Sequence, residues 1–377
     1  MSKKVRKTPV WAVVLIVFGS LLTVGGGGGA VASQALAARY AGAVQTQDLF
    51  GEAVTEEEAK SDIKGPLNFL LVGIDPRKPE TPPLADSIMV VHIPATLDAA
   101  YIFSIPRDTY VEIPAFAKSG TGAQRGKING AMSIGSQVRG KPLPSAAQGF
   151  ELLSKTVSKL TGIKKFDAGA IINFDGFKRV VDAMGGIDLY VDERTVSEHL
   201  APDGKGRPYH PQFRGDEHPY TGPKKTYEIG NHHFKGWEAL DFARQRYGLK
   251  GTDYGRQRHQ QQVMKAIAKK AGSSDVITNP VKLDKVLTAA GKSLTFNGRG
   301  KTVLDYALAM KGLRPDNITT IKLVGGRYPV SGTYLGEKLV PATDDLFEAI
   351  RTEKIDEFLL LNPEFLNTNA AAKKGSD

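Results

Sequence analysis

The hydrophobic positions of this chain form one long block near the N-terminus and short, separated runs elsewhere. No charged residue occurs between Thr8 and Ala38, and Val10–Val24 is almost entirely apolar. A hydrophobic stretch of about 20 residues is long enough to cross a bilayer as a helix. The block follows four basic residues (Lys3, Lys4, Arg6 and Lys7), and such residues favour the cytoplasmic side. The pattern therefore predicts a basic cytoplasmic tail over 1–8, a transmembrane signal-anchor over 9–33, and a single-pass type II cell-membrane protein whose remainder is extracytoplasmic.

A cleavable signal peptide is the alternative interpretation of the same block. Val10–Val24 has the length of a signal-peptide core, and Ala35-Leu36-Ala37 has the small-x-small form of a cleavage site. Both interpretations export the rest of the chain, and the uncleaved anchor is the one we adopt. The chemistry of the exported part must therefore run without cytoplasmic ATP or reducing power.

Short apolar runs after this block indicate an α/β domain. We expect a polar juxtamembrane spacer over 34–65, a folded domain over 66–355 and a C-terminal tail over 356–377. Short continuous apolar runs predict buried strands, whereas a spacing of 3.6 residues predicts helices. Strands are expected over 68–73, 87–93, 100–105, 168–174 and 187–191, and helices over 148–160, 175–184, 237–243 and 256–271. The series strand–helix–strand over 168–191 predicts a βαβ unit.

The long segment Glu193–Lys225 interrupts these elements. It is rich in Pro, Gly, His and charged residues, so we expect a loop, and long loops of compact domains often act as lids or binding loops. The histidines in and around it do not have the spacing of a zinc site. We therefore expect them to be ordinary loop or surface residues.

Charge and composition narrow the classes of function. The net charge is +10, of which the four N-terminal basic residues account for +4 and the remainder for +6. A basic exported domain attracts polyanions such as anionic lipid head groups, pyrophosphates or wall polymers; nucleic acid is not expected there, and a basic surface that serves solubility alone is the alternative. The chain has no cysteine, which excludes disulfides and cysteine ligands or nucleophiles. Neither a P-loop nor a G-x-S-x-G motif is present.

Two carboxylates flank the first two expected strands of the domain. Asp75 directly follows the first strand and Asp86 directly precedes the second. If the two strands pair as antiparallel neighbours, both carboxylates reach the same edge of the sheet. Mg²⁺ is usually held by one or two protein carboxylates together with substrate phosphates. The alternative is that each aspartate only caps a turn.

Arginines are the second group of candidate residues. Arg107 and Asp108 follow Pro106, which cannot donate a sheet hydrogen bond, so both are expected at a strand end. Arginine binds phosphate oxygens through two parallel hydrogen bonds. A local Arg–Asp pair is the alternative for Arg107.

Arg244 and Arg246 can serve one site only if the backbone between them has a particular conformation. Residues two apart point to different sides of a helix but to the same side of an extended chain. If both arginines serve one site, the helix from Trp237 must end near Ala243 and the chain must extend there. A solvated basic helix end is the alternative.

The helix expected from Arg256 has one mixed stripe. Arg256, Gln260, Val263 and Ile267 fall on one face, with the polar residues first and the apolar residues after them. The start of a helix also favours anions. A helix that packs its C-terminal half on the core and offers Arg and Gln from its N-terminal half would show this pattern.

Taken together, these segments resemble the LytR–CpsA–Psr (LCP) family of cell-wall glycopolymer ligases. Seven segments occur in the family's order over about two hundred residues: GIDPR (73–77), DSIMVVHI (86–93), SIPRDTYVEIP (104–114), KINGA (127–131), INFDGFKRVVDAMGGIDLYV (172–191), GWEALDFARQR (236–246) and DYGRQRHQQQV (253–263). The resemblance implies an α-β-α fold with a central mixed β-sheet flanked by helices and a hydrophobic pocket that binds a polyprenyl chain.

The resemblance also implies a reaction. Members of the family are phosphotransferases that move a phosphoglycan from a polyprenyl-pyrophosphate carrier to a sugar hydroxyl of peptidoglycan and release polyprenyl phosphate. The phosphoglycan is of the teichoic acid, arabinogalactan or capsule type. Mg²⁺ is the implied cofactor, and cleavage of the polyprenyl pyrophosphate itself is the expected side activity. The implied partners are the lipid-linked glycan, the peptidoglycan acceptor and the cell membrane, with no nucleic acid. A non-catalytic protein that binds polyprenyl phosphate or wall polymer with the same fold is the alternative.

Carried over position by position, the resemblance assigns roles to ten residues. Asp75 and Asp86 match the family's magnesium-site aspartates, and Arg107, Arg244, Arg246, Arg256 and Gln260 match its pyrophosphate-binding residues, while Lys127, Asp108 and Asp253 match further recurrent polar positions. Asp75, Asp86 or Asp108 is the expected base for the acceptor hydroxyl, and Arg107 belongs to the catalytic set. The sequence departs from the family at Ala85 and His259, where arginine is common, and at Ser87, where threonine is common. The loss of an arginine at position 85 is expected to remove one phosphate contact.

Overall fold

The computed structural model describes residues 45–367, apart from 77, 211, 213–218, 252, 272, 274–275, 277–278, 292–293, 311 and 330. The predicted cytoplasmic tail and signal-anchor lie outside these residues. Among the described residues, no helix combines the length and apolar character needed to cross a membrane.

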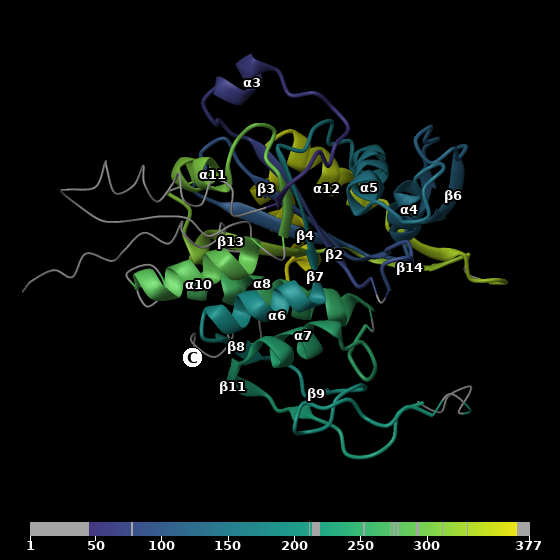
Figure 1. Cartoon of the computed structure of the whole chain (residues 1–377), viewed down its shortest axis with the longest axis vertical. Helices are drawn as coiled ribbons and strands as arrows, with labels where there is room; N and C mark the ends of the chain where they lie inside the picture. Colours follow the sequence, from purple (N-terminus) through teal and green to yellow (C-terminus); the bar gives the residue numbers. More distant parts are fainter. Residues whose placement is uncertain are drawn as a thin grey trace, which may run out of the picture.

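A seven-stranded sheet forms the centre of the fold (Figure 1). Its strand order is β1-β12-β7-β2-β3-β4-β13. Neighbours β12/β7, β2/β3 and β3/β4 are antiparallel, whereas β1/β12, β2/β7 and β4/β13 are parallel, so the sheet is mixed, as expected. The strands are β1 (Gln45–Thr46), β2 (Leu67–Ile74), β3 (Ala85–Ile93), β4 (Ala100–Ile105), β7 (Ala168–Asn173), β12 (Leu294–Asn297) and β13 (Ile318–Lys322).

Helices cover both faces of this sheet, which gives the expected α-β-α layers. On one face, α4, α5, α12 and α13 share a core with Leu70, Val72 and Ile74 of β2. The other face carries the layer of α6, α7, α8 and α10, as Figure 1 shows below the sheet. The helices are α4 (Ile128–Ser136), α5 (Ala146–Thr161), α6 (Phe174–Ala183), α7 (Gly236–Arg244), α8 (Asp253–Ala271), α10 (Pro280–Gly291), α12 (Ala342–Arg351) and α13 (Ile355–Leu361).

The remaining elements are short. Outside the central sheet, β5 (Tyr110–Ile113) pairs with β6 (Gln124–Lys127), and β14 (Gly325–Tyr328) pairs with β15 (Gly336–Leu339). The others are α3 (Glu56–Lys60), β8 (Ile187–Val191), β9 (Thr195–Val196), β10 (Thr226–Tyr227), β11 (Gly230–Phe234), α11 (Val303–Ala309) and the 3₁₀ turns Pro315–Asn317 and Pro363–Phe365.

Local signals set the ends of several helices. Ser145 caps α5 by accepting a hydrogen bond from the backbone N–H of Gln148, and Gly162 ends that helix in the left-handed conformation with φ 72°. The predicted strands and helices all occur, and no end differs from its prediction by more than three residues. The described residues of the segment Glu193–Lys225 form a loop apart from the two residues of β9, as expected.

The predicted βαβ unit over 168–191 is wrong. Strand β8 forms as expected but leaves the central sheet and pairs antiparallel with β11, from Ile187 opposite Phe234 to Val191 opposite Gly230. The neighbours of β7 in the central sheet are β12 and β2. A strand–helix–strand pattern in the sequence predicts which residues form strands. It does not predict which strand each one pairs with, and the partner of β8 is the distant β11.

The boundaries of the spacer and the tail also need correction. Within the expected spacer, β1 joins the edge of the central sheet, and Leu49 and Phe50 are buried in its core. Within the expected tail, α13 packs on the core, and the ring of Phe358 meets that of Phe365 edge-on, with centroids 5.1 Å apart. The packed structure therefore includes residues on both sides of the expected domain 66–355, because apolar residues outside it complete the core.

Candidate active site

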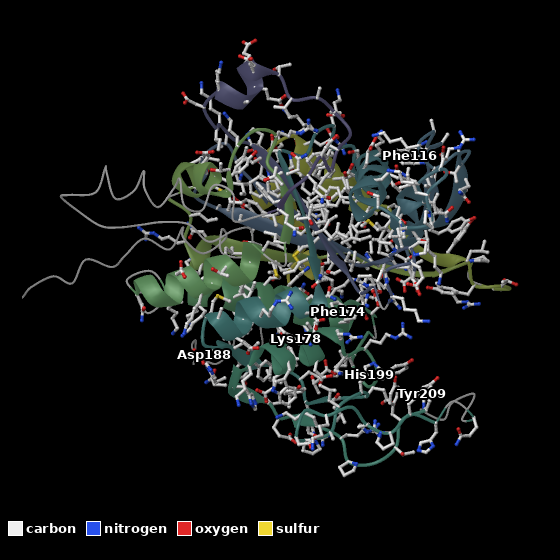
Figure 2. All side chains as sticks on the ribbon, viewed as in Figure 1. Phe116, Phe174, Lys178, Asp188, His199 and Tyr209 are labelled. Atoms are coloured by element: carbon white, nitrogen blue, oxygen red, sulfur yellow. The ribbon has the colours of Figure 1, made fainter. Side chains whose placement is uncertain are left out.

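A cavity of about 380 Å³ lies between the central sheet and the layer of α6, α7 and α8. Its walls are largely apolar; they include Leu71, Met89, Ala170 and Ile172 from the sheet, and Phe177, Val180, Leu240, Val263, Met264 and Ile267 from the helices. Phe174, the first residue of α6, and His199, from the long loop, also line the cavity. Figure 2 labels both, with His199 below Phe174.

The polar part of the cavity is made by seven of the ten predicted site residues. Asp75, Asp86, Arg107, Arg244, Arg246, Arg256 and Gln260 all line it. They come from four separate stretches of the chain: the β2 end, the β3 start, the segment after β4, and the α7–α8 region. The cavity thus joins an apolar interior to a mouth rich in arginine and carboxylate.

The pairing of β2 with β3 brings the two aspartates together. The strands are antiparallel neighbours, with Gly73 opposite Ser87, and the register shifts at Ile74. Asp75 follows β2 directly, as expected, whereas Asp86 is the second residue of β3 instead of preceding it. Both carboxylates therefore lie at the same edge of the sheet, where β2 ends and β3 begins.

Each of these aspartates has an arginine partner. A guanidinium nitrogen of Arg107 lies 2.7 Å from a carboxylate oxygen of Asp86, and one of Arg244 lies 3.5 Å from Asp75. The Arg244 guanidinium also lies over the ring of Phe174, 4.4 Å from its centroid. The site is held together by mutual pairing of its acids and bases.

The chain geometry required for Arg244 and Arg246 to share a site is present. Helix α7 ends at Arg244, and Gln245 adopts an extended conformation with φ −65° and ψ 136°. Both arginines consequently line the same cavity. The prediction that the helix ends near Ala243 is confirmed.

A buried polar cluster holds this break in place. Gln245 donates to a carboxylate oxygen of Asp241 at 2.6 Å and accepts from the backbone N–H of Glu198 at 2.9 Å. Asp241 also accepts hydrogen bonds from Ser197 and Tyr227, each at 2.9 Å. Burial raises the pKa of Asp241, and the hydrogen bonds from these side chains oppose that shift.

Arg256 is the most enclosed cation of the site. Its side chain pairs with Asp253 at 2.8 Å, and its pKa is lowered because burial disfavours the charged form. The Nε atoms of Arg256 and Arg107 are both buried, and neither has a hydrogen-bond partner among the described residues. Buried donors without partners cost free energy, so these two favour binding of an anion at the mouth.

The stripe on α8 follows the wall of the cavity. Arg256, Gln260, Val263 and Ile267 all line it, with the polar residues at the mouth and the apolar ones deeper. The side-chain carbonyl of Gln260 accepts a hydrogen bond from Ser87 at 3.0 Å. The helix therefore spans both the polar and the apolar parts of the site.

Three predicted residues lie at the rim instead of lining the cavity. Asp253 reaches the site only through Arg256, and Lys127 pairs with Asp108 at 3.4 Å. The structure also adds residues that pattern reasoning missed, namely Asn173, Phe174, His199 and Tyr247. Asn173 caps α6 by accepting from the N–H of Gly176, so its position at a strand-to-helix junction was the available signal.

Two of the three departures from the family, Ala85 and His259, are buried outside the cavity. His259 is fully buried, stacks on Phe242 with ring centroids 3.9 Å apart, and has its pKa lowered to about 4 by burial. Ala85 is buried in the core cluster that contains Ile74 and Ile88, and it does not line the cavity. The expected loss of a phosphate contact at position 85 stays a prediction.

The fold and the site define an α/β domain with an amphiphilic cavity whose mouth is basic. The sequence profile of the LytR_cpsA_psr family matches residues 34–351. The chain belongs to the LytR_cpsA_psr family.

Two curated relatives show the span of the likeness. The chain is 31% identical over 241 residues to the polyisoprenyl-teichoic acid–peptidoglycan teichoic acid transferase TagU of Bacillus cereus, which covers 64% of this chain and 63% of TagU. It is 26% identical over 331 residues to the cell wall biosynthesis protein LcpA of Corynebacterium glutamicum, which covers 84% of this chain and 55% of LcpA. The chain thus matches less than two thirds of the length of either relative.

Solved structures agree on the fold. The crystal structure of B. subtilis TagV superposes with a TM-score of 0.52 and 24% identity, covering 78% of this chain and 98% of TagV. At this identity the likeness establishes the architecture alone.

Proposed function

We propose that the protein is a membrane-anchored, Mg²⁺-dependent phosphotransferase of the bacterial cell wall. In this proposal it moves a phosphoglycan from a polyprenyl-pyrophosphate carrier to a sugar hydroxyl of peptidoglycan and releases polyprenyl phosphate. The observation that carries the proposal is the cavity, which is apolar inside and ends in four arginines and two aspartates. The names of TagU and LcpA as wall transferases or wall biosynthesis proteins support the same class of reaction.

The cavity suits an amphiphilic donor. Apolar side chains of the sheet and of α6–α8 would bury the polyprenyl chain, since apolar surface leaves water favourably. The arginines would hold the two phosphates, because guanidinium groups pair with phosphate oxygens through two parallel hydrogen bonds. Arg256 and Arg107, whose Nε donors are unpaired, would gain partners in that complex.

The transfer step forms and breaks one bond at phosphorus. An oxygen of the acceptor hydroxyl bonds to the phosphorus that bears the glycan, the bridging P–O bond of the anhydride breaks, and polyprenyl phosphate leaves with the electron pair. Phosphoryl transfer depends mainly on positioning and charge neutralisation. Arg107, Arg244 and Arg246 would neutralise the leaving phosphate. The proton of the hydroxyl would pass to Asp75, Asp86 or Asp108.

Asp75 and Asp86 are the residues that would hold Mg²⁺. The described residues contain no cluster of three or more potential metal ligands, and two carboxylates beside a phosphate site fit the usual coordination of Mg²⁺. When bound, the ion supplies charge neutralisation at the phosphates. The ion pairs of these aspartates with Arg244 and Arg107 would then rearrange toward the donor.

The test uses the full chain in detergent with a polyprenyl pyrophosphate. We expect slow cleavage of the pyrophosphate in Mg²⁺ and loss of cleavage by at least about a hundredfold in Arg107→Ala, comparable to removal of one transition-state contact. Arg125→Ala is the matched control, because Arg125 is an exposed arginine on β6 that does not line the cavity. Full activity of Arg107→Ala would refute the site.

A non-catalytic lipid-binding protein with this fold is the second candidate. It is favoured by one observation: the carboxylates of both site aspartates pair with arginines of the same site. Binding of polyprenyl phosphate without turnover, and unaffected by a chelator, would establish this candidate and refute the transferase.

A further inference from the structure

The hairpin of β14 and β15 is attached to two segments of the proposed active site. The backbone N–H of Glu337 donates to the carbonyl of Asp108 at 2.8 Å, next to Arg107. The hydroxyl of Tyr254, at the start of α8, donates to a carboxylate oxygen of Glu337 at 2.7 Å. The hairpin is thereby fixed to the segment that carries Arg107 and to the helix that carries Arg256.

The attachment is close as well as polar. A Cβ added at Gly336 would lie 2.5 Å from the carbonyl oxygen of Asp108, and one added at Gly325 would lie 2.6 Å from the hydroxyl oxygen of Tyr254. Side chains larger than hydrogen do not fit at either position. The hairpin therefore has a set place relative to the mouth, next to α4 and β6 at the right of Figure 1.

Three half-buried tyrosines form the outer surface of this region, which we call the tyrosine platform: Tyr110, Tyr328 and Tyr334. The rings of Tyr110 and Tyr328 stack with centroids 5.5 Å apart and an interplanar angle of 29°. The hydroxyl of Tyr334 lies 3.5 Å from a carboxylate oxygen of Asp108. The platform thus adjoins the rim of the proposed transfer site.

Cations surround the rings of the platform. Lys127 lies 4.7 Å and Arg327 lies 5.2 Å from the ring centroid of Tyr334, and Lys338 lies 5.8 Å from that of Tyr328. Cations at these distances are attracted by the ring faces and hold the rings in place. The surface therefore combines flat, rigid aromatic faces with positive charge.

We propose that the tyrosine platform binds the glycan strand of the acceptor and delivers its hydroxyl to the phosphates at the mouth. The proposal rests on the proposed transferase function. Tyrosine offers a large rigid contact face at little entropic cost and a hydroxyl for hydrogen bonds, which suits the apolar face and polar rim of a pyranose. The surrounding cations complement the carboxylates of the peptides that peptidoglycan strands carry.

Position separates this surface from the donor site. None of the three platform tyrosines lines the cavity, whereas Arg107 does. The platform adjoins Asp108, the chain neighbour of Arg107, and stays outside the cavity. An acceptor bound there would reach the phosphates without entering the apolar interior that the donor would occupy.

The experiment measures binding separately from catalysis. Soluble, uncrosslinked peptidoglycan strands are titrated into the full-length protein in detergent by calorimetry, without donor or Mg²⁺. We expect Tyr328→Ala to weaken strand binding by about tenfold, since interface energy concentrates in a few aromatic contacts. Tyr328→Phe keeps the ring and should bind within about twofold of the native protein, which also shows that the hairpin still folds.

The control lies on the other exposed loop. Tyr209 is 58% exposed in the segment Glu193–Lys225, and Figure 2 labels it at the lower right of the molecule, away from the central sheet. Tyr209→Ala should leave strand affinity unchanged. Loss of affinity in Tyr209→Ala but not in Tyr328→Ala would overturn the proposal and assign the acceptor to that loop.

Donor cleavage in the absence of strands distinguishes the two proposals. Cleavage that survives while strand affinity is insensitive to Tyr328→Ala would refute the platform alone. Strand binding that depends on Tyr328, with no cleavage by the native protein, would refute the transfer reaction and leave the binding surface.

Discussion

Removal of the Asp241 carboxylate tests whether the buried cluster behind α7 sets the geometry of the arginines. Asp241 is 5% exposed and accepts hydrogen bonds from Ser197, Tyr227 and Gln245, which are themselves almost fully buried. Asp241→Ala leaves these three donors without their acceptor. The same cluster holds Gln245 in the extended conformation that separates Arg244 from Arg246. Stability and ligand binding should therefore fall together.

The magnitude follows from the number of donors left unpaired. A buried donor that loses its acceptor costs about 1–3 kcal/mol. Three unpaired donors would cost at least about 3 kcal/mol. Removal of the buried carboxylate also removes its desolvation cost, which offsets part of any larger loss. We therefore expect Asp241→Ala to lower the free energy of unfolding by about 3 kcal/mol. Asp241→Asn keeps an acceptor oxygen and should cost about 1 kcal/mol.

The assay combines urea denaturation with binding of polyprenyl phosphate. Asp241→Ala should lower the denaturation midpoint and, under conditions where it is still folded, bind the lipid phosphate at least about tenfold more weakly, since displacement of one arginine removes a charge-assisted contact. Asp241→Asn is the matched control and should keep most of the affinity. A folded Asp241→Ala variant with native affinity would show that the cluster does not position the arginines.

Two further predictions concern stability. The pKa of His259 is about 4 in the folded protein against 6.5 in the unfolded chain, so the unfolded chain binds the proton first as the pH falls. The free energy of unfolding should therefore decrease below pH 6.5, by about 2 kcal/mol at pH 5. His259→Phe should flatten this pH dependence of the urea midpoint, whereas an equally steep profile in the variant would assign the dependence to other groups. Gly149→Ala places a Cβ 2.4 Å from the carbonyl oxygen of Met132 where α4 and α5 touch, and should lower the thermal midpoint, with a cost of about 1–3 kcal/mol. Gly130→Ala on the same α4 meets nothing within 4 Å and should raise stability by about 0.5–1 kcal/mol, so a similar loss in both variants would contradict the packing argument.

Local patterns predicted the elements of this fold well, because each depends on neighbours in sequence. The strand Ala100–Ile105 and the end of α5 at Gly162 required only an apolar run and a residue that tolerates positive φ. The break after Arg244 was inferred from the spacing of two arginines, and the extended Gln245 agrees with it. Pairing was harder: β8 was predicted correctly as a strand, yet its partner β11 lies about forty residues away.

The candidate site shows the same division. Seven of the expected residues line one cavity. They could be named from the sequence because each lies in a short motif next to an expected strand or helix end. His259, which stands where the family commonly has arginine, is stacked on Phe242 in the core and does not line the cavity. Asp108 and Lys127, which match recurrent polar positions of the family, do not line the cavity and pair with each other at 3.4 Å beside the hairpin of β14 and β15.

The sequence alone determined the family, the α/β class and the identity of the acids and arginines, because these depend on residue types, their order and short-range periodicity. The family resemblance implied a hydrophobic pocket, but only the tertiary structure decided which side chains line the cavity and that the tyrosine platform stands beside its charges. Both features are built from segments more than a hundred residues apart, such as Tyr110 and Tyr328. Contacts over such separations arise from the packing of the whole core, and no local pattern in the chain encodes them individually.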